Sequence, residues 1–191
     1  SLKVNYYGTK NLIENKIESK KKIWFFFASS SHVYKISNKK LKENDILKPL
    51  TPYGKTKYEA EKYLLKKLRK NSSRICIGRI FSYTHKSQTL PYLVPSIFEK
   101  LRKKNKKIIF KNLNHERDFS HIDDICRAIN LLKKKNITGI YNIASGNSVK
   151  LYDLAKMINK NKKLIFHKEN KLKTKLIEKI SKIKKIGFEP R

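Results

Sequence analysis

Two short stretches hold the side chains best suited to chemistry. A hydroxyl run, "SSSHVYK" from residue 29, ends an apolar segment, and "TPYGKTK" from residue 51 follows it. On a helix, the spacing of Tyr53 and Lys57 puts both side chains on one face, one turn apart. A phenol titrates at about pH 10, and a nearby ammonium favours the phenolate, which brings the pKa toward the neutral range. With a serine hydroxyl beside it, such a pair could move a proton on and off an alcohol or carbonyl oxygen.

Each part of this set also has an ordinary structural explanation. Tyr-x-x-x-Lys is common on helices, and a serine run at the end of a strand usually forms a turn or a cap. The catalytic interpretation gains from position, because open α/β sheets hold their ligands at the carboxyl ends of the strands. Both interpretations stay open on these residues alone.

The elements that would position these groups alternate along the chain. Continuous apolar runs predict strands buried in a parallel sheet, and amphipathic spacing predicts the helices between them. Thr51 is expected to cap the helix that contains Tyr53, with Pro52 in its first turn, while Ser148 caps a later helix and Gly187 closes the last. Strands alternating with long helices indicate right-handed crossovers and an α/β fold. The expected strands are 23–29, 74–81, 106–112, 139–145 and 163–168, and the expected helices are 2–22, 52–70, 95–104, 120–135, 149–160 and 176–187.

The charge of the chain is extreme, with 47 Lys and Arg against 15 Asp and Glu, a net charge of +32. One interpretation is a nucleic-acid binder. The excess is mostly lysine and is scattered over every segment, without an arginine patch interleaved with aromatic residues. We therefore favour solvated lysine-rich helix faces, which predict only non-specific affinity for polyanions that salt weakens strongly.

The remaining composition suggests a cytoplasmic protein. Cys76 and Cys126 lie in apolar patterns without metal-ligand spacing, so we expect two buried free thiols and no metal site. No apolar run is long enough to span a bilayer, and the first residues do not have the pattern of a signal peptide. The six glycines do not form a phosphate-cradling Gly-x-Gly-x-x-Gly or Gly-x-x-x-x-Gly-Lys loop.

Seven sequence blocks, taken in order, carry a family resemblance. The blocks are "VNYYGTKNLIE", "FFFASSSHVYK", the loop glutamate Glu43, "PLTPYGKTKYEAEKYL", "GRIFSYT", "RDFSHIDDICRAI" and "GIYNIASGNSVKLYDLAKMI". This series resembles the extended short-chain dehydrogenase/reductase family, the NAD-dependent epimerases, dehydratases and reductases of nucleotide sugars. The resemblance extends from about Val4 to Pro190. It implies a Rossmann-like, doubly wound parallel sheet with a small interleaved substrate domain.

The resemblance also implies roles for particular residues near the cofactor, which would be NAD or NADP. Ser30 would be the catalytic hydroxyl residue and Tyr53 the general acid/base. Lys57 would bind the nicotinamide ribose and keep the pKa of the tyrosine low. Asn5 and Phe81 match positions near the cofactor, although a helix-surface Asn and a buried strand-end Phe explain them equally well.

For the substrate, the resemblance implies that Arg117 grips the nucleotide diphosphate, a task that suits the bidentate guanidinium. Ser82 stands where many members have an Asn that faces the substrate. Asp118 is expected to support the local backbone. His121 and Asp123 are expected to begin a helix and not to bind a metal.

Two departures from the family pattern bear on the reaction. The 4,6-dehydratases carry acidic residues just after the catalytic hydroxyl residue, where this chain has Ser31 and His32. A dehydratase is therefore disfavoured, and the sequence leaves 4-epimerisation and keto-reduction of a nucleotide sugar as alternatives. A family Gly-Pro is replaced here by His85-Lys86, which puts the geometry of the substrate loop in doubt.

The family opens with a strand and a Gly-rich turn that bind the pyrophosphate, and this chain lacks both. We therefore expect a fragment or truncated product that binds NAD poorly alone and exposes an apolar sheet edge. Residues 1–82 and 117–145 would belong to the cofactor domain, and residues 83–116 and 146–191 to the substrate part.

Three classes of function stay open. The first is an enzyme acting on a nucleotide sugar, which by resemblance would form a homodimer through helices 1–18 and 52–70, without a membrane partner. The second is a non-catalytic remnant of the family that serves as a binding or assembly module. The third is a basic nucleic-acid binder, which is disfavoured because charge alone indicates non-specific association.

Overall fold

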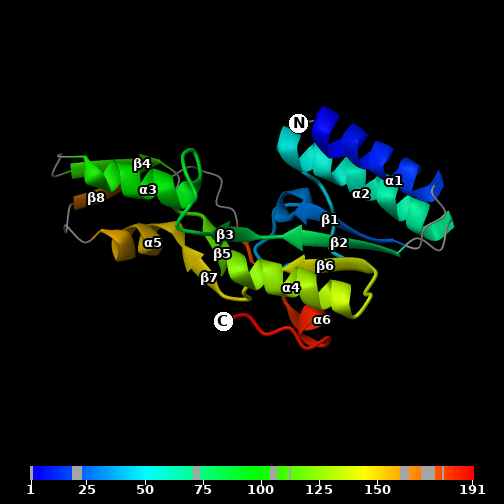
Figure 1. Ribbon diagram of the computed structural model, residues 1–191. Coiled ribbons are helices and arrows are strands. Elements are labelled where there is room, and N and C mark those ends of the chain that lie inside the picture. The colour runs from blue at the N-terminus through cyan, green and yellow to red at the C-terminus, as the bar shows by residue number, and fades with distance from the viewer. Residues whose placement is uncertain are drawn as a thin grey trace.

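The computed structural model describes residues 2–18, 23–70, 74–103, 107–111, 113–159, 164–168, 175–177 and 179–191. Helices and strands alternate along most of the chain (Figure 1). In order they are η1 (Lys3–Gly8, a π-helical turn), α1 (Thr9–Glu18), β1 (Trp24–Ser30), η2 (Ser31–Val33, a 3-10 turn), α2 (Pro52–Lys70), β2 (Arg74–Ile80), β3 (Ser82–Thr84), α3 (Leu93–Arg102), β4 (Lys107–Lys111), β5 (Glu116–His121), α4 (Ile122–Lys134), β6 (Gly139–Ile143), β7 (Ser148–Lys150), α5 (Leu151–Ile158), β8 (Leu164–Lys168), β9 (Lys175–Leu176) and α6 (Ser181–Lys184).

The first sheet is parallel throughout, with strand order β1-β2-β6. Its side chains alternate between two faces, as the pleat of a strand requires. Phe27 and Ile77 pack with α1 and α2 on one face, whereas Cys76 and Tyr141 pack with α4 and α6 on the other. Figure 1 shows this layering, with α1 and α2 above the sheet and α4 and α6 below it. The expected α/β fold with a parallel sheet is confirmed.

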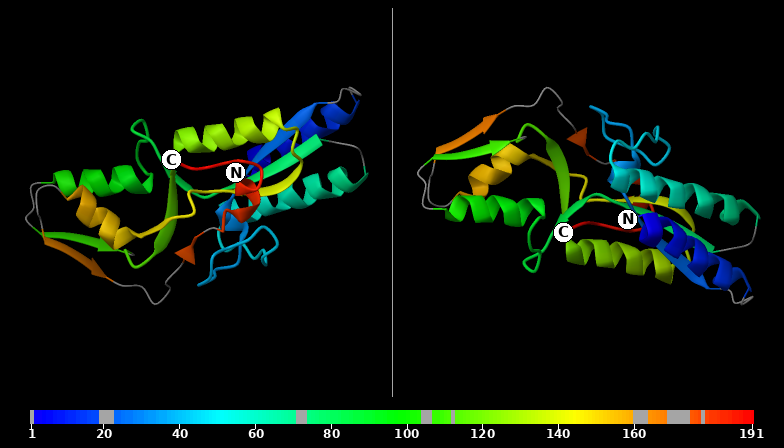
Figure 2. Two further views of the ribbon diagram at one scale, coloured as in Figure 1. Left: turned by 90° about the horizontal axis from the view of Figure 1, so that it is seen from below. Right: turned by 90° about the horizontal axis from the view of Figure 1, so that it is seen from above.

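The second lobe is built from short strands and two helices. Strand β5 pairs with β3 and β9 in parallel and with β7 antiparallel, and β4 pairs with β8 in parallel. Helices α3 and α5 cover this lobe through a core that includes Ile97, Leu101 and Phe110. The views of Figure 2 place the two lobes at opposite ends of an elongated molecule, with β3 and β5 between them.

Four short strands, β3, β5, β7 and β9, were not expected from the sequence. The prediction that Ser148 caps a helix is wrong: it lies in β7, and its hydroxyl donates to Glu116 Oε1 at 2.6 Å. Helix α5 begins only after Lys150. Thr51 does cap α2, since its Oγ1 accepts the N–H of Gly54 at 3.0 Å.

The end of the chain packs differently from the expected domain division. Residues after 175 were assigned to the substrate part, yet Leu176, Ile183 and Phe188 join the core under the first sheet. The last helix is one short turn, Ser181–Lys184, and not a helix over 176–187. Gly187, with φ +91°, closes the turn that follows the helix, and its N–H donates to the carbonyl oxygen of Lys184 at 2.8 Å. Cys126, expected to be buried, is exposed, and Cys76 is buried.

Two further features of the described residues bear on the expectations. Strand β1 pairs with β2 on one side, and among the described residues its other edge has no strand partner. Among the helices described, not one is both long and apolar enough to cross a membrane.

Candidate active site

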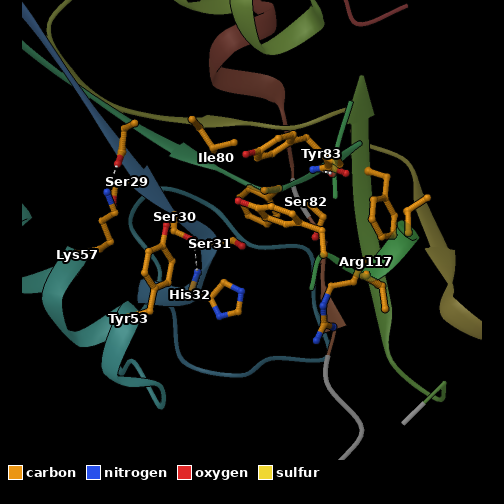
Figure 3. Close-up of a pocket in the computed structure, with 17 residues that line it drawn as sticks. Ser29, Ser30, Ser31, His32, Tyr53, Lys57, Ile80, Ser82, Tyr83 and Arg117 are labelled. Carbon is orange, nitrogen blue, oxygen red and sulfur yellow. Dashed lines mark hydrogen bonds between the residues drawn. The ribbon is translucent and has the colours of Figure 1, made fainter. Parts of the chain in front are cut away.

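A cavity of about 590 Å³ opens where β1 and β2 end, between the two lobes. Figure 3 shows the side chains that line it, which come from β1, η2, α2, β2, β3, β5, the loop before α3 and the start of α3. The cavity brings together six of the seven residues predicted from the sequence: Ser30, Tyr53, Lys57, Phe81, Ser82 and Arg117. The carboxyl ends of the parallel strands therefore form the candidate site, as the sheet type predicts.

The three serines after Ala28 are separated by the geometry of the strand end. Ser30 is the last residue of β1, and its Oγ accepts the N–H of His32 at 3.3 Å, which starts the η2 turn. Ser29 points to the interior, where its hydroxyl contacts the Glu61 carboxylate. Ser30, for which the resemblance implies a catalytic role, is thus the serine whose side chain lies beside Tyr53.

Helix α2 presents Tyr53 and Lys57 to the cavity from its first two turns. A Cβ added at Gly54 would lie 2.4 Å from the carbonyl oxygen of His32, so only a glycine lets the helix start pack this closely on η2. Side chains four residues apart then share one helix face. This close packing brings Tyr53 beside Ser30 and His32, and the ring centroids of His32 and Tyr53 are 6.0 Å apart.

The electrostatics of this pair differ from the expectation. Burial raises the pKa of the Tyr53 phenol above its ordinary value, and its hydrogen bond with Ser30 acts in the opposite direction. Lys57 Nζ donates to the carbonyl oxygen of Ala28 at 2.9 Å and lies 5.8 Å from the Tyr53 ring centroid. Burial lowers the pKa of Lys57 itself. In the protein alone Lys57 is not among the groups that shift the pKa of Tyr53, so its role in keeping that pKa low stays a prediction for the complex with cofactor.

The other side of the cavity comes from β2, β3 and β5. Phe81 is buried behind Ser82, and its N–H donates to the carbonyl oxygen of Ile143 at 3.0 Å. Ser82 of β3 pairs with Phe119 of β5, and Arg117 lies two residues before Phe119 on β5. Burial lowers the pKa of Arg117 to about 10. A cation held inside the cavity wall favours an anionic ligand.

Arg117 also lines a second cavity, of about 380 Å³, in the lobe of α3 and α5. Leu93 is the other residue common to both cavities. Phe110, His115 and Lys100 contribute to the second cavity, whose wall is largely apolar. The two cavities therefore meet at one guanidinium.

Asp118 and His121 have the structural roles predicted for them. The buried Asp118 carboxylate accepts the backbone N–H groups of Ser145 and Gly146 at 2.8 and 2.7 Å, which fixes the turn after β6. His121 Nδ1 accepts the N–H of Asp123 at 3.3 Å and caps α4. Among the described residues, no group of His, Cys, Asp or Glu could hold a metal ion.

Asn5 lies outside the cavity. Its Nδ2 donates to Thr56 Oγ1 at 3.2 Å, which ties η1 to α2. Of the two explanations given for this residue, the described contacts favour the structural one.

Sequence reasoning missed two groups of residues. Tyr83, in β3, and Tyr92, just before α3, line the cavity, and the sequence indicated neither the strand nor the position of the helix start beside the cavity. The second group is a buried ion pair, in which the Arg79 guanidinium donates to the Glu61 carboxylate at 2.7–3.1 Å. The sequence did contain a signal for this pair. Arg79 and Glu61 stand at positions where the periodicity of the strand and of the helix predicts buried apolar residues, and their charges are opposite.

Known proteins are similar to this chain over most of its length. A family model described as "GDP-mannose 4,6 dehydratase" matches residues 1–191. GDP-6-deoxy-D-talose 4-dehydrogenase of Aggregatibacter actinomycetemcomitans is 28% identical over 158 residues, which are 81% of this chain and 53% of that protein. A relative from Methanocaldococcus jannaschii, whose name refers to UDP-glucose 4-epimerase, is 29% identical over 162 residues. The chain spans about half the length of these curated relatives.

Two solved structures show the same fold at low sequence identity. RMD from Pseudomonas aeruginosa, complexed with NADPH, has a TM-score of 0.90 and 20% identity, over 100% of this chain and 69% of that one. A mutant of UDP-glucuronic acid 4-epimerase from Bacillus cereus, in complex with NAD and a fluorinated sugar nucleotide, has a TM-score of 0.85 and 24% identity. That match covers 97% of this chain and 62% of the epimerase.

Proposed function

Because the chain belongs to the family of NAD-dependent nucleotide-sugar epimerases, dehydratases and reductases, we propose that it supplies the Ser–Tyr–Lys set of an epimerase or reductase of a nucleotide sugar. The whole protein would transfer a hydride between a sugar carbon and NAD or NADP. The curated relatives act, by their names, on GDP- and UDP-linked sugars, which is the substrate class proposed here.

The observation that carries this proposal is the position of Arg117 between two cavities. A nucleotide sugar has a base and a sugar at its ends and a diphosphate between them. The largely apolar second cavity suits the base, the first cavity suits the sugar, and the shared guanidinium suits the diphosphate. The first cavity is lined by the cations Lys57 and Arg117 and, among the described residues, by no carboxylate.

The residues at the ends of β1 and β2 fit the nicotinamide half of a dinucleotide cofactor. The Lys57 ammonium has three protons, of which one is donated to Ala28, so ribose hydroxyls can take the others. Phe81 and Ile80 offer an apolar wall beside them. When bound, the cofactor would supply the acceptor and donor of the hydride.

In this proposal the protein's own residues handle the proton. Tyr53 would take the proton of the sugar hydroxyl as the carbonyl forms and return it in the reverse direction. Ser30, already hydrogen-bonded to the phenol, would donate to the same oxygen and hold the sugar in place. Because burial raises the pKa of the free phenol, the tyrosine needs further positive charge in the cavity to act as a base at neutral pH.

Two variants test the proposal by calorimetric binding of UDP, UDP-glucose, GDP and GDP-mannose. Arg117→Leu should weaken nucleotide binding at least tenfold, because a charge-assisted hydrogen bond contributes about 1.5–3 kcal/mol. Tyr53→Phe should preserve binding and abolish turnover in the presence of NAD(P). Arg74→Leu is the matched control, since Arg74 is exposed at the opposite end of β2. Equal affinities for the Arg117 and Arg74 variants would contradict the proposal.

A second candidate is a binding module without catalysis. Two observations favour it: the pKa of Tyr53 is raised, and Lys57 Nζ donates to the backbone carbonyl oxygen of Ala28. In the protein alone, Tyr53 is therefore not prepared to act as a base. It predicts Arg117-dependent nucleotide binding without turnover, even by the unmodified chain with NAD(P).

The proposal extends to a homodimer formed through η1, α1 and α2. These helices lie side by side on the outer face of the first lobe (Figure 1). Four large apolar residues are exposed here: Leu2 just before η1, Val4 and Tyr7 on η1, and Leu12 on α1. A partner that covers them would remove this apolar surface from water.

A further inference from the structure

His32 has a fixed place in the first cavity. Its backbone N–H is bonded to Ser30 Oγ, and its carbonyl oxygen is held against Gly54 at the start of α2. Its ring projects into the cavity between Tyr53 and Arg117 (Figure 3). The edge-on contact with the Tyr53 ring, at 6.0 Å between centroids, makes the two side chains neighbours on one cavity wall.

The groups that face His32 disfavour its charged form. Tyr53 and Lys57 come from α2, Tyr83 from β3 and Arg117 from β5, and the described lining contains no carboxylate. Burial, and then the charge of Arg117, lower the pKa of His32 below its ordinary value of 6.5. At neutral pH the ring is therefore a neutral imidazole, with one nitrogen that donates and one that accepts a hydrogen bond.

This acceptor complements the other polar groups of the cavity. Tyr53 is a protonated phenol at neutral pH, because its own pKa is raised, and Lys57 and Arg117 are donors only. A sugar presents several hydroxyl groups on adjacent carbons, and each needs an acceptor when water is excluded. Two side chains whose ring centroids are 6.0 Å apart can contact neighbouring hydroxyls of one sugar ring.

We propose that His32 is a specificity-determining residue, which accepts a hydrogen bond from a sugar hydroxyl next to the one that Tyr53 handles. The inference rests on the proposed function and adds to it a residue that contacts the sugar and not the nucleotide. The neutral ring is the active form, so protonation would remove the acceptor and weaken the recognition of the sugar.

The test compares how much the sugar adds to the affinity of a nucleotide. The ratio of the dissociation constants of UDP and UDP-glucose, with GDP and GDP-mannose as a second pair, is measured by calorimetry at pH 7.5. His32→Phe keeps an aromatic ring against Tyr53 but has no acceptor, and it should reduce this ratio roughly fivefold to tenfold, the effect of one neutral hydrogen bond. The affinity for UDP or GDP alone should not change. His32→Asn, whose side-chain oxygen is an acceptor, should restore part of the ratio.

The pH dependence gives a second readout. The terminal phosphate of UDP or GDP titrates at about pH 6, and the sugar nucleotides have no such group, so the unmodified protein is compared with His32→Asn at each pH. As the pH is lowered through the pKa of His32, the ratio for the unmodified protein should fall relative to the ratio for His32→Asn.

The outcomes separate this inference from the proposed function. If UDP and GDP bind with Arg117-dependent affinity but His32→Phe leaves the ratio unchanged, the role of His32 is overturned and the proposed function stands. If neither nucleotide binds, or if binding ignores Arg117, both fail together. Thermal unfolding checks that the variants fold, which is expected because the ring of His32 faces the cavity and lies outside the core clusters.

Discussion

The phenol of Tyr53 is subject to two opposing influences in the protein alone. Burial disfavours its ionised form, and the bond with Ser30 favours it less strongly, so the pKa lies above the ordinary value of 10.0. Lys57 contributes little because its ammonium is directed to the carbonyl oxygen of Ala28. The proton of Tyr53 is thus held until another positive charge enters the cavity.

This arrangement predicts the titration of one tyrosine. In NMR spectra of protein labelled at the tyrosine Cζ, the Tyr53 resonance, assigned with Tyr53→Phe, should titrate above pH 10.0, the ordinary value for a phenol. Lys57→Met should leave that midpoint nearly unchanged, because the ammonium is engaged elsewhere. A midpoint below the ordinary value in the unmodified protein that rises in Lys57→Met would show that Lys57 already acts on the phenol.

The identity of the site residues could be predicted from the sequence, but their electrostatics could not. The spacing of Tyr53 and Lys57 indicated one helix face, the resemblance singled out Ser30 at a strand end, and all three line the cavity. The direction in which the pKa of Tyr53 shifts depends on how deeply the ring is buried and on which acceptor the Lys57 ammonium donates to. Neither is encoded in a spacing of four residues.

At the scale of elements, a buried polar network joins α2 to the first sheet. Arg79 of β2 and Glu61 of α2 are 1% and 0% exposed. Arg79 also donates to the hydroxyl of Tyr34, which in turn donates to Asn142 Oδ1 of β6 at 2.6 Å. Since Ser29 of β1 contacts the same Glu61, the network fixes three strand ends and the helix that carries Tyr53.

Removing one charge of this pair should destabilise the whole fold. Glu61→Gln keeps the shape but leaves the buried Arg79 charge without a counter-charge, although its hydrogen bond to Tyr34 remains, which costs about 3–5 kcal/mol in the free energy of unfolding. Glu59→Gln on the same helix is the matched control, because its pair with Lys62 is exposed and contributes less than about 1 kcal/mol. Urea unfolding measures both. A loss for Glu61→Gln no larger than that for Glu59→Gln would show that the pair is not coupled to stability.

Elements with a local signal were predicted well, whereas those that depend on distant partners were missed. The long apolar run of β1 and the periodicity of α2 identify themselves. The sequence "ERDFSH" of β5 has only two buried side chains, Asp118 and Ser120, and both are polar. It becomes a strand because β3, β7 and β9 pair with it, and such pairing leaves little trace in a short polar segment.

At the scale of the whole molecule, the apolar surface is uneven. On η1 and α1, Val4 and Leu12 are 77% and 63% exposed, and Tyr7 is also exposed. Isolated exposed apolar residues are common, but several on one helix are typical of an interface. In the proposed homodimer this surface is covered by a second copy of the chain.

Substitutions on this surface should change the oligomeric state. Sedimentation velocity should show a dimer for the unmodified protein and a shift to monomer for the double variant Val4→Glu, Leu12→Glu, because two charges would be buried at the interface. Met157→Glu is the matched control: Met157 is 72% exposed on α5, in the other lobe, and its substitution should leave the dimer intact. An unmodified protein that is monomeric at high concentration would rule the dimer out.

The pairing of β5 has a consequence for the order in which the protein folds. Its partners lie at residues 82–84, 148–150 and 175–176, so the strand completes its ladder only after nearly all of the chain has been synthesised. The strand pairing of the first sheet needs residues only up to Ile143, although Leu176 and Phe188 complete its core. Closing long loops slows folding. Arg117, on β5, should therefore reach its final position after Ser30 and Tyr53. The part of the cavity proposed for the sugar would then form before the part proposed for the diphosphate.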